Sequence, residues 1–88
     1  MNMQPQFETT REVTVISKIL ADLVHTVELI ESDIVAEEER ARISNRSDAK
    51  YPILARSLIE RRDNIRMTIA ALEQRLIERA CEQVATAA

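Results

Sequence analysis

The chain of 88 residues contains no glycine. Glycine is the residue that most easily adopts the left-handed backbone conformations of tight turns and bulges. A chain without glycine is poorly suited to a sheet of short hairpins, and it has only two aromatic residues, Phe7 and Tyr51. Pro52 lies between two long stretches in which apolar residues recur with helical spacing. These features predict one all-α domain with a single bend.

The first helix is expected to span residues 9–43, after a flexible segment of residues 1–8. Thr9 and Glu12 have the spacing of a capping box, in which each side chain bonds the backbone N–H near the other residue. The apolar positions that follow are separated by steps of three and four residues, as in a heptad repeat. The residues expected to face the second helix are Val13, Ile16, Leu20, Leu23, Val27, Ile30 and Ile34.

The bend is expected at residues 44–51, where serine, asparagine and aspartate favour turns. Pro52 suits the first turn of a helix, so the second helix is expected over residues 52–86, followed by a frayed tail of residues 87–88. Its apolar spacing is close to an eleven-residue repeat, which is typical of a nearly straight path. Its inward residues are expected to be Leu54, Leu58, Ile65, Ile69, Leu72 and Leu76.

Two helices of equal length joined by a short bend form an antiparallel hairpin. A hairpin buries only one row of side chains from each helix, so we expect two copies to associate into a four-helix bundle, with a higher oligomer left open. A second apolar row beside the inward residues of the second helix is predicted to form this interface. It consists of Ile59, Ala70, Ile77, Cys81 and Val84.

One basic residue, Arg61, interrupts the inward row of the second helix. When the chain is folded back about residue 47, Asp33 and Glu37 lie opposite Arg61. A partly buried ion pair at this point is predicted to set the register of the two helices, as polar residues do in coiled coils.

The formal net charge is −3, but the charge is unevenly distributed. Residues 7–43 hold nine acidic and four basic residues, whereas the bend and the second helix are slightly basic. The basic bend end could contact the phosphates of a nucleic acid. The possible phosphate contacts are Arg46, Lys50, Arg56, Arg62 and Arg66. The acidic residues 37–39 lie close by, and Tyr51 is the one base-stacking group nearby, so nucleic-acid binding is the alternative hypothesis.

The single histidine, His25, has Asp22 and Glu28 three residues to either side. Di-iron carboxylate bundles use glutamate and histidine at this spacing. However, His25 occupies an outward heptad position and has no second histidine to join it, so we expect no metal or other cofactor. Cys81 cannot form an internal disulfide and is expected to be a small packing residue.

No combination of side chains forms a recognisable catalytic set, so the sequence predicts no enzyme activity. No apolar run reaches the roughly 18 residues of a membrane span, and the first residues do not resemble a signal peptide. The sequence therefore predicts a cytoplasmic, non-enzymatic protein-interaction module that acts as a homo-oligomer. An adaptor, co-chaperone or regulator with an unidentified protein partner fits this description.

Overall fold

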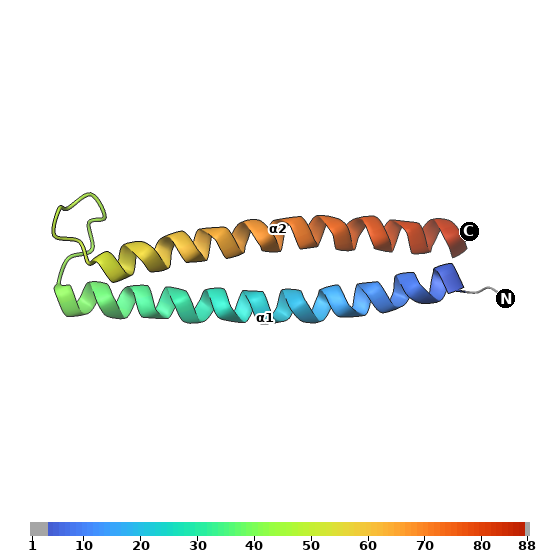
Figure 1. The fold of residues 1–88 in the computed structure, drawn as a ribbon, viewed down its shortest axis with the longest axis horizontal. Helices are drawn as coiled ribbons and strands as arrows, with labels where there is room; N and C mark the ends of the chain where they lie inside the picture. The colour runs from blue at the N-terminus through green and yellow to red at the C-terminus, as the bar shows by residue number, and fades with distance from the viewer. Residues whose placement is uncertain (1–3, 88) are drawn as a thin grey trace.

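A computed structural model shows two antiparallel helices lying side by side (Figure 1). It describes the backbone of residues 4–87 and the side chains of residues 10–82. Helix α1 spans Gln4–Ala41 and helix α2 spans Ile53–Ala87, and the described backbone contains no strand. The predicted all-α hairpin is confirmed.

The molecule is a rod that is one helix pair thick. Its extents are 63 × 18 × 15 Å, and its radius of gyration is 19.1 Å. A compact domain of this length would have a radius of gyration of about 12 Å. The start of α1 and the end of α2 share one end of the rod, and the bend forms the other end (Figure 1).

The predicted start of the first helix at Thr9 is wrong. Helix α1 begins at Gln4, so Thr9 lies inside it and residues 4–8, expected to be flexible, are helical. Pro5 lies in the first turn, where the missing N–H of proline removes no helical hydrogen bond. Residues 1–3 and Ala88 lie outside the described residues. The other boundaries differ from the prediction by two residues or fewer, a normal scatter for helix ends.

Helix α1 ends in a Schellman motif that has arginine in the usual glycine position. The N–H of Ile43 donates to the carbonyl of Glu38 at 3.2 Å, and the N–H of Arg42 donates to the carbonyl of Glu39 at 3.2 Å. This pattern of bonds requires a left-handed residue after the helix. Arg42 has that conformation, with a φ of 59°. The backbone of Arg42 is therefore strained, because its Cβ crowds the following carbonyl oxygen.

Two short polar side chains shape the remaining loop. Oδ1 of Asn45 accepts from the N–H of Ser47 at 2.9 Å, and Oδ1 of Asp48 accepts from the N–H of Lys50 at 2.7 Å. The N–H of Asp48 donates to the carbonyl of Asn45, and that of Tyr51 donates to the carbonyl of Asp48, both at 3.0 Å. These bonds define two successive turns, so the chain reverses its direction without glycine.

The seam between the helices is the core of the molecule. Ile16, Val27, Ile30 and Ile34 of α1 are buried. The other predicted core residues of α1 and most of those of α2 are half-buried: Val13, Leu20, Leu23, Leu58, Ile65, Ile69, Leu72 and Leu76. The described side chains thus form one thin apolar layer with no third element to enclose it.

Leu54 was predicted to be a core residue and is instead half exposed, so that prediction is wrong. Tyr51 and Ala55 are buried in its place, and Ala55 is 0% exposed. They lie one turn apart on the same side of the chain, where the bend brings the helices together. A methyl group fits this close approach, whereas the larger side chain of Leu54 points to solvent.

The true seam of α2 follows an unbroken rhythm of four-residue and three-residue steps. It starts at Tyr51, just before the helix begins, and continues with Ala55, Leu58, Arg62, Ile65, Ile69, Leu72, Leu76 and Arg79. This is a heptad pattern and not the eleven-residue repeat expected from the sequence. The expectation failed because it began the row at Leu54 and took Arg61 in place of Arg62, and so passed over Tyr51 and Ala55.

The strained Arg42 generates a prediction about stability. Arg42→Gly should raise the free energy of unfolding by about 0.5–1 kcal/mol, since glycine avoids the left-handed penalty but loses more backbone entropy on folding. Urea denaturation measures the change. Arg42→Ala is the matched control, because it keeps a Cβ and should change little. A lower stability for Arg42→Gly would contradict the left-handed conformation.

Candidate functional site

Two ion-pair clamps join the helices, and each has one glutamate of α1 held by two arginines of α2. Glu31 forms ion pairs with Arg62 and Arg66. Glu12, near the open end of the rod, forms ion pairs with Arg75 and Arg79. The arginines of each clamp are four residues apart, so one turn of α2 brackets one carboxylate.

The clamp at Glu31 is the more buried one on the arginine side. The side chain of Arg62 is 13% exposed, and its Nη1 lies 3.9 Å from Oε2 of Glu31. Nη2 of Arg62 also contacts Oδ1 of Asp63 at 3.1 Å. Arg66 donates a hydrogen bond to the same Oε2 of Glu31 from the outer edge of the seam. The alkyl stem of Arg62 therefore fills a seam position while its charge remains paired.

The clamp at Glu12 is more open. Nε of Arg79 lies 2.7 Å from Oε1 of Glu12, and Nη2 of Arg75 lies 3.4 Å from its Oε2. Arg79 also pairs with Glu82 at 2.9 Å. The hydrogen bond to Glu82 and the charge of Glu12 raise the pKa of Arg79 above its ordinary value. Arg79 thus holds its positive charge at the open end of the seam.

The predicted register pair of Arg61 with Asp33 and Glu37 is wrong. Arg61 and Asp33 are exposed, and neither forms an ion pair within residues 10–82. Glu37 pairs with Arg40, one turn along its own helix, at 2.7 Å. Arg62 holds the seam position because it lies seven residues after the buried Ala55, whereas Arg61 lies seven residues after the exposed Leu54. The unbroken spacing was the signal that could have identified Arg62.

A second feature of the surface is a set of exposed aliphatic side chains. On α1 these include Val24 and Val35, and on α2 they include Ile77, which is 57% exposed. Single exposed aliphatic residues are normal on a protein surface. Whether they form a continuous face depends on which side of the hairpin they occupy.

The clamp between Glu31 and Arg66 shows that several of them share one side. Val24 lies seven residues before Glu31 and Val35 lies four after it, so all three lie on one side of α1. On α2, Ile59, Ala70 and Ile77 lie seven residues before, four after and eleven after Arg66. Because the two charged residues contact each other, both rows lie on the same side of the hairpin. We call Val24, Val35, Ile59, Ala70 and Ile77 the apolar face.

The apolar face contains three of the five predicted interface residues. Ala70 and Ile77 are exposed, and Ile59 is half-buried at the edge of the seam. Cys81 is exposed, but it lies fourteen residues after Met67, which places it on the outermost row of α2, away from the seam. Val84 lies beyond the described side chains. Sequence reasoning missed Val24 and Val35, because only contacts between the helices show which flanks of α1 and α2 meet.

Tyr51 fastens the bend to α1. Its side chain is buried, and its hydroxyl donates to Oε2 of Glu38 at 2.6 Å. Nε of Arg46 lies 3.9 Å from the same oxygen, and the guanidinium of Arg56 lies 5.3 Å from the centre of the tyrosine ring. Burial and the neighbouring Glu38 raise the pKa of Tyr51 above its ordinary value, whereas Arg46 lowers it. Tyr51 therefore has a structural role at the bend.

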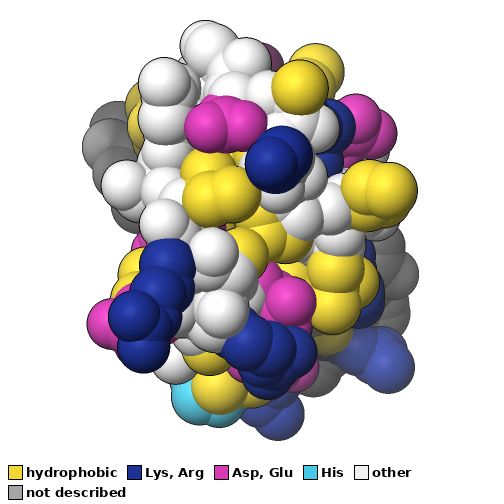
Figure 2. Space-filling view, turned by 90° about the vertical axis from the view of Figure 1, so that its left-hand side faces the viewer, with side chains coloured by type: hydrophobic (Ala, Val, Ile, Leu, Met, Phe, Trp, Pro, Cys, Tyr) yellow, Lys and Arg dark blue, Asp and Glu magenta, His cyan; other side chains and the backbone are white. Residues whose placement is uncertain are grey.

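The predicted phosphate contacts do not form one open basic surface. Arg46 pairs with Glu38, and Arg62 and Arg66 pair with Glu31. Lys50 and Arg56 are exposed and form no ion pair within the described residues. Figure 2 views the rod from the bend end and shows basic, acidic and hydrophobic side chains intermixed.

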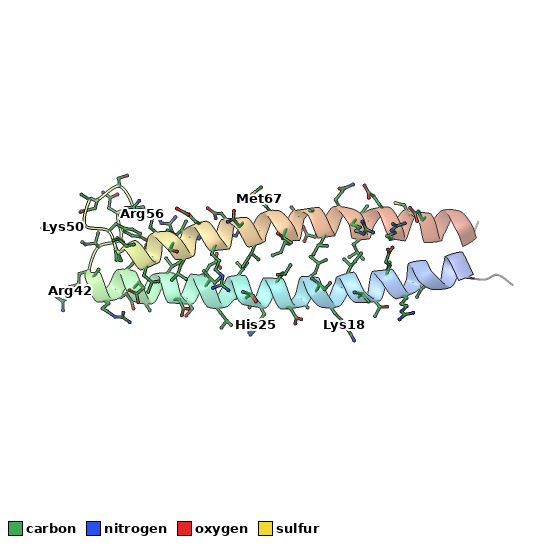
Figure 3. The ribbon with its side chains drawn as sticks, in the orientation of Figure 1. Lys18, His25, Arg42, Lys50, Arg56 and Met67 are labelled. Atoms are coloured by element: carbon green, nitrogen blue, oxygen red, sulfur yellow. The ribbon has the colours of Figure 1, made fainter. Side chains whose placement is uncertain are left out.

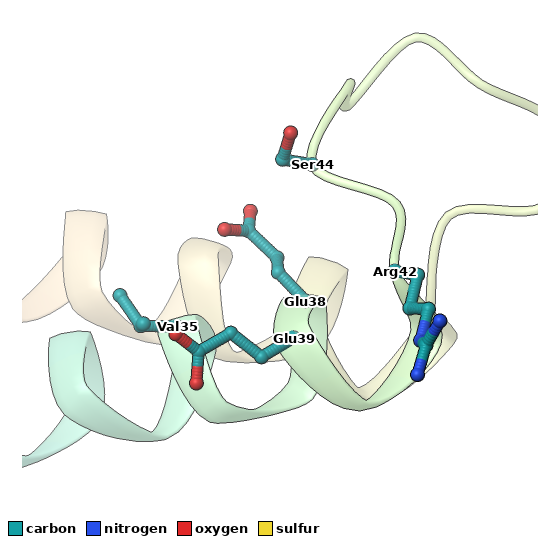
Figure 4. Close-up of a pocket in the computed structure, with 5 residues that line it drawn as sticks. All are labelled: Val35, Glu38, Glu39, Arg42 and Ser44. Atoms are coloured by element: carbon teal, nitrogen blue, oxygen red, sulfur yellow. The ribbon is translucent and has the colours of Figure 1, made fainter.

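A shallow hollow of about 340 Å³ lies between the last turns of α1 and the loop (Figure 4). Its lining residues are Val35, Glu38, Glu39, Arg42 and Ser44. The two carboxylates give it an acidic character, and the Arg42 side chain points away from the Glu38 carboxylate (Figure 4). An adjoining hollow of about 260 Å³ is lined by Glu31, Ile34, Val35, Glu38, Arg46 and Arg62. The apolar face thus ends at an acidic edge near the bend.

His25 points away from α2 (Figure 3). Its Nδ1 lies 3.9 Å from Oε1 of Glu28, and both side chains are largely exposed. Among the residues that the structure describes, no three histidine, cysteine, aspartate or glutamate side chains converge as metal ligands would. The spacing of Asp22, His25 and Glu28 therefore does not bring them together as one site.

Within the described part of the chain, neither helix combines the length and the apolar character needed to cross a membrane. Comparisons with protein families, curated proteins and solved structures find no match to this chain.

The clamps generate a prediction about neighbouring arginines. Arg62→Ala should lower the free energy of unfolding by about 1–2 kcal/mol, because the change leaves a void in the seam and removes part of the Glu31 pair. Arg61→Ala removes the same side chain one position away and should stay within about 0.5 kcal/mol of the wild type. Urea denaturation of both variants shows which of the two arginines lies in the seam. Equal losses of stability would contradict the placement of Arg62 there.

The bend generates a prediction about pH. Folded Tyr51 keeps its proton above the pH near 10 at which an unfolded tyrosine ionises. Its stabilising effect is therefore fully present below pH 10 and is lost as the pH rises through the folded pKa. Tyr51→Phe has no such proton, so the wild type should lose stability more steeply than this variant between pH 9 and 11. Thermal melts at each pH measure this, and parallel curves would contradict it.

Proposed function

We propose that this chain is a non-enzymatic protein-interaction module that works as a homodimer joined through the apolar face. Support comes from one observation: three of the exposed aliphatic side chains, Val24 and Val35 of α1 and Ile77 of α2, lie on the side of the hairpin that carries the Glu31–Arg66 pair. A second hairpin packed on this side would complete a four-helix bundle. The bundle would then act as an adaptor, co-chaperone or regulator by binding another protein.

The exposed area supports the proposal. The chain has a solvent-accessible surface of 6486 Å², roughly 1,200 Å² more than the approximately 5,300 Å² expected of a compact monomer of this mass. Each partner in a protein–protein interface of standard size buries about 800 Å². Packing along one side of the rod would therefore remove much of the excess surface from water.

The observations favour protein binding over the alternative of nucleic-acid binding. Three of the five predicted phosphate contacts are paired with glutamates of α1, so a phosphate would have to displace those carboxylates. The acidic α1, with nine acidic and three basic residues, would also repel a nucleic acid along the rod. We place the module in the cytoplasm, because the exposed free thiol of Cys81 suits a reducing compartment.

The experiment is a measurement of mass and self-affinity by sedimentation equilibrium. The wild-type chain of 10.1 kDa should show twice that mass at micromolar concentration. Ile77→Glu places a charge in the apolar face and should weaken dimerisation at least tenfold, since an unpaired charge is costly to bury.

Met67→Glu is the matched control. Met67 is 71% exposed and points away from α1, so the same change of charge there should leave the dimer intact (Figure 3). A wild-type chain that remains monomeric would overturn the proposal. Equal weakening of dimerisation by both variants would show that the apolar face is not the dimer interface.

A further inference from the structure

We propose that the two copies pair with their bends at the same end of the bundle, so that α1 of each copy lies over α2 of the other. This inference rests on the proposed function, because it takes the occupant of the apolar face to be a second copy of this chain. It goes further by naming the orientation and the helices that meet.

The ion-pair clamps establish which residues of the two helices lie at the same height along the rod. Glu31 is bracketed by Arg62 and Arg66, and Glu12 by Arg75 and Arg79. Counting along both helices from the Glu31 clamp places Val35 at about the height of Ile59 and Val24 at about the height of Ala70. Each apolar position of α1 on this face thus lies beside an apolar position of α2.

A twofold axis parallel to the rod preserves these heights. It brings α1 of one copy over α2 of the other, with Val35 near Ile59 of the second copy and Val24 near Ala70. At the height between them, Glu28 and Glu31 approach Arg66 of the second copy. Val24 and Val35 therefore meet apolar positions, whereas the carboxylates of Glu28 and Glu31 meet Arg66 together with the Asp63–Arg62 pair of the second copy.

An axis across the rod would place the bends at opposite ends and α2 over α2. Asp63, Ala70 and Ile77 share one row of α2 at seven-residue intervals, and residue 70 is the midpoint of this helix. Reversal about the midpoint brings Ile77 over Asp63 of the second copy, and this contact occurs twice. The Asp63–Arg62 ion pair would then be desolvated against an aliphatic side chain, which offers it no hydrogen bond.

The charges of whole helices favour the same orientation. Helix α1 holds nine acidic and three basic residues, a formal charge of −6, whereas α2 holds five acidic and six basic residues, a formal charge of +1. Packing α1 over α1 would bring two strongly acidic helices together. Packing α1 over α2 separates them to diagonal corners of the bundle, where repulsion is weaker.

The proposed orientation places both bends side by side at one end. That end would present two copies of Arg42, Lys50, Ile53 and Arg56, all of them exposed, and Ile53 is 85% exposed. The opposite orientation would divide these residues between two ends 63 Å apart along the rod. Orientation therefore decides whether the bends form one surface or two.

The experiment is a distance measurement between spin labels by pulsed dipolar spectroscopy. Lys50→Cys combined with Cys81→Ser carries one label at the bend, where Lys50 is exposed. Bends at the same end should give a distance below about 35 Å, since packed helices are about 10 Å apart and the labels add their own length. Bends at opposite ends should give about 60 Å, at 1.5 Å per residue of helix.

Met67→Cys combined with Cys81→Ser is the control, because Met67 lies close to the midpoint of α2 and should give a short distance in either orientation. A long distance at residue 50 with a short one at residue 67 would overturn the orientation and leave the dimer standing. No dipolar coupling at residue 67, together with a monomeric mass, would overturn the dimer and the orientation alike.

Discussion

Contact between α1 and α2 is confined to one row of side chains from each helix, because a helix pair has no third element to surround it. Ile16, Val27, Ile30 and Ile34 are the buried part of α1, and the inward side chains of α2 are mostly half-buried. Burial of apolar surface is the main favourable term in folding. The single layer therefore accounts for both the shape of the rod and the apolar side chains left exposed along it.

A thin apolar layer specifies the register of two helices weakly, because aliphatic side chains can slide by one turn at little cost. The ion-pair clamps at Glu31 and Glu12 make the register more specific. A slip by one turn would take Arg62 or Arg79 away from its glutamate and leave a charge in the seam. Register also places Val24, Val35, Ile59, Ala70 and Ile77 on one side, so the apolar face depends on the clamps.

The bend shows how a chain without glycine reverses its direction. Arg42 takes the left-handed position at the end of α1, and Asn45 and Asp48 use their side chains to stabilise two turns. Tyr51 then fastens the loop to Glu38. Local hydrogen bonds offset the strain at Arg42. The bend therefore brings the end of α1 close to the start of α2.

The sequence by itself determined that this chain is a helical hairpin with a bend at about residues 44–51, because periodic apolar spacing and turn-forming residues are local properties. It also determined the inward side of α1. Tertiary structure alone decided that Ala55 and Arg62 hold seam positions in place of Leu54 and Arg61. It also decided that Val24 and Val35 share a side with Ile77. The reason is that spacing along one helix defines a stripe, but only the close approach of the second helix selects which stripe is covered and which flanks meet.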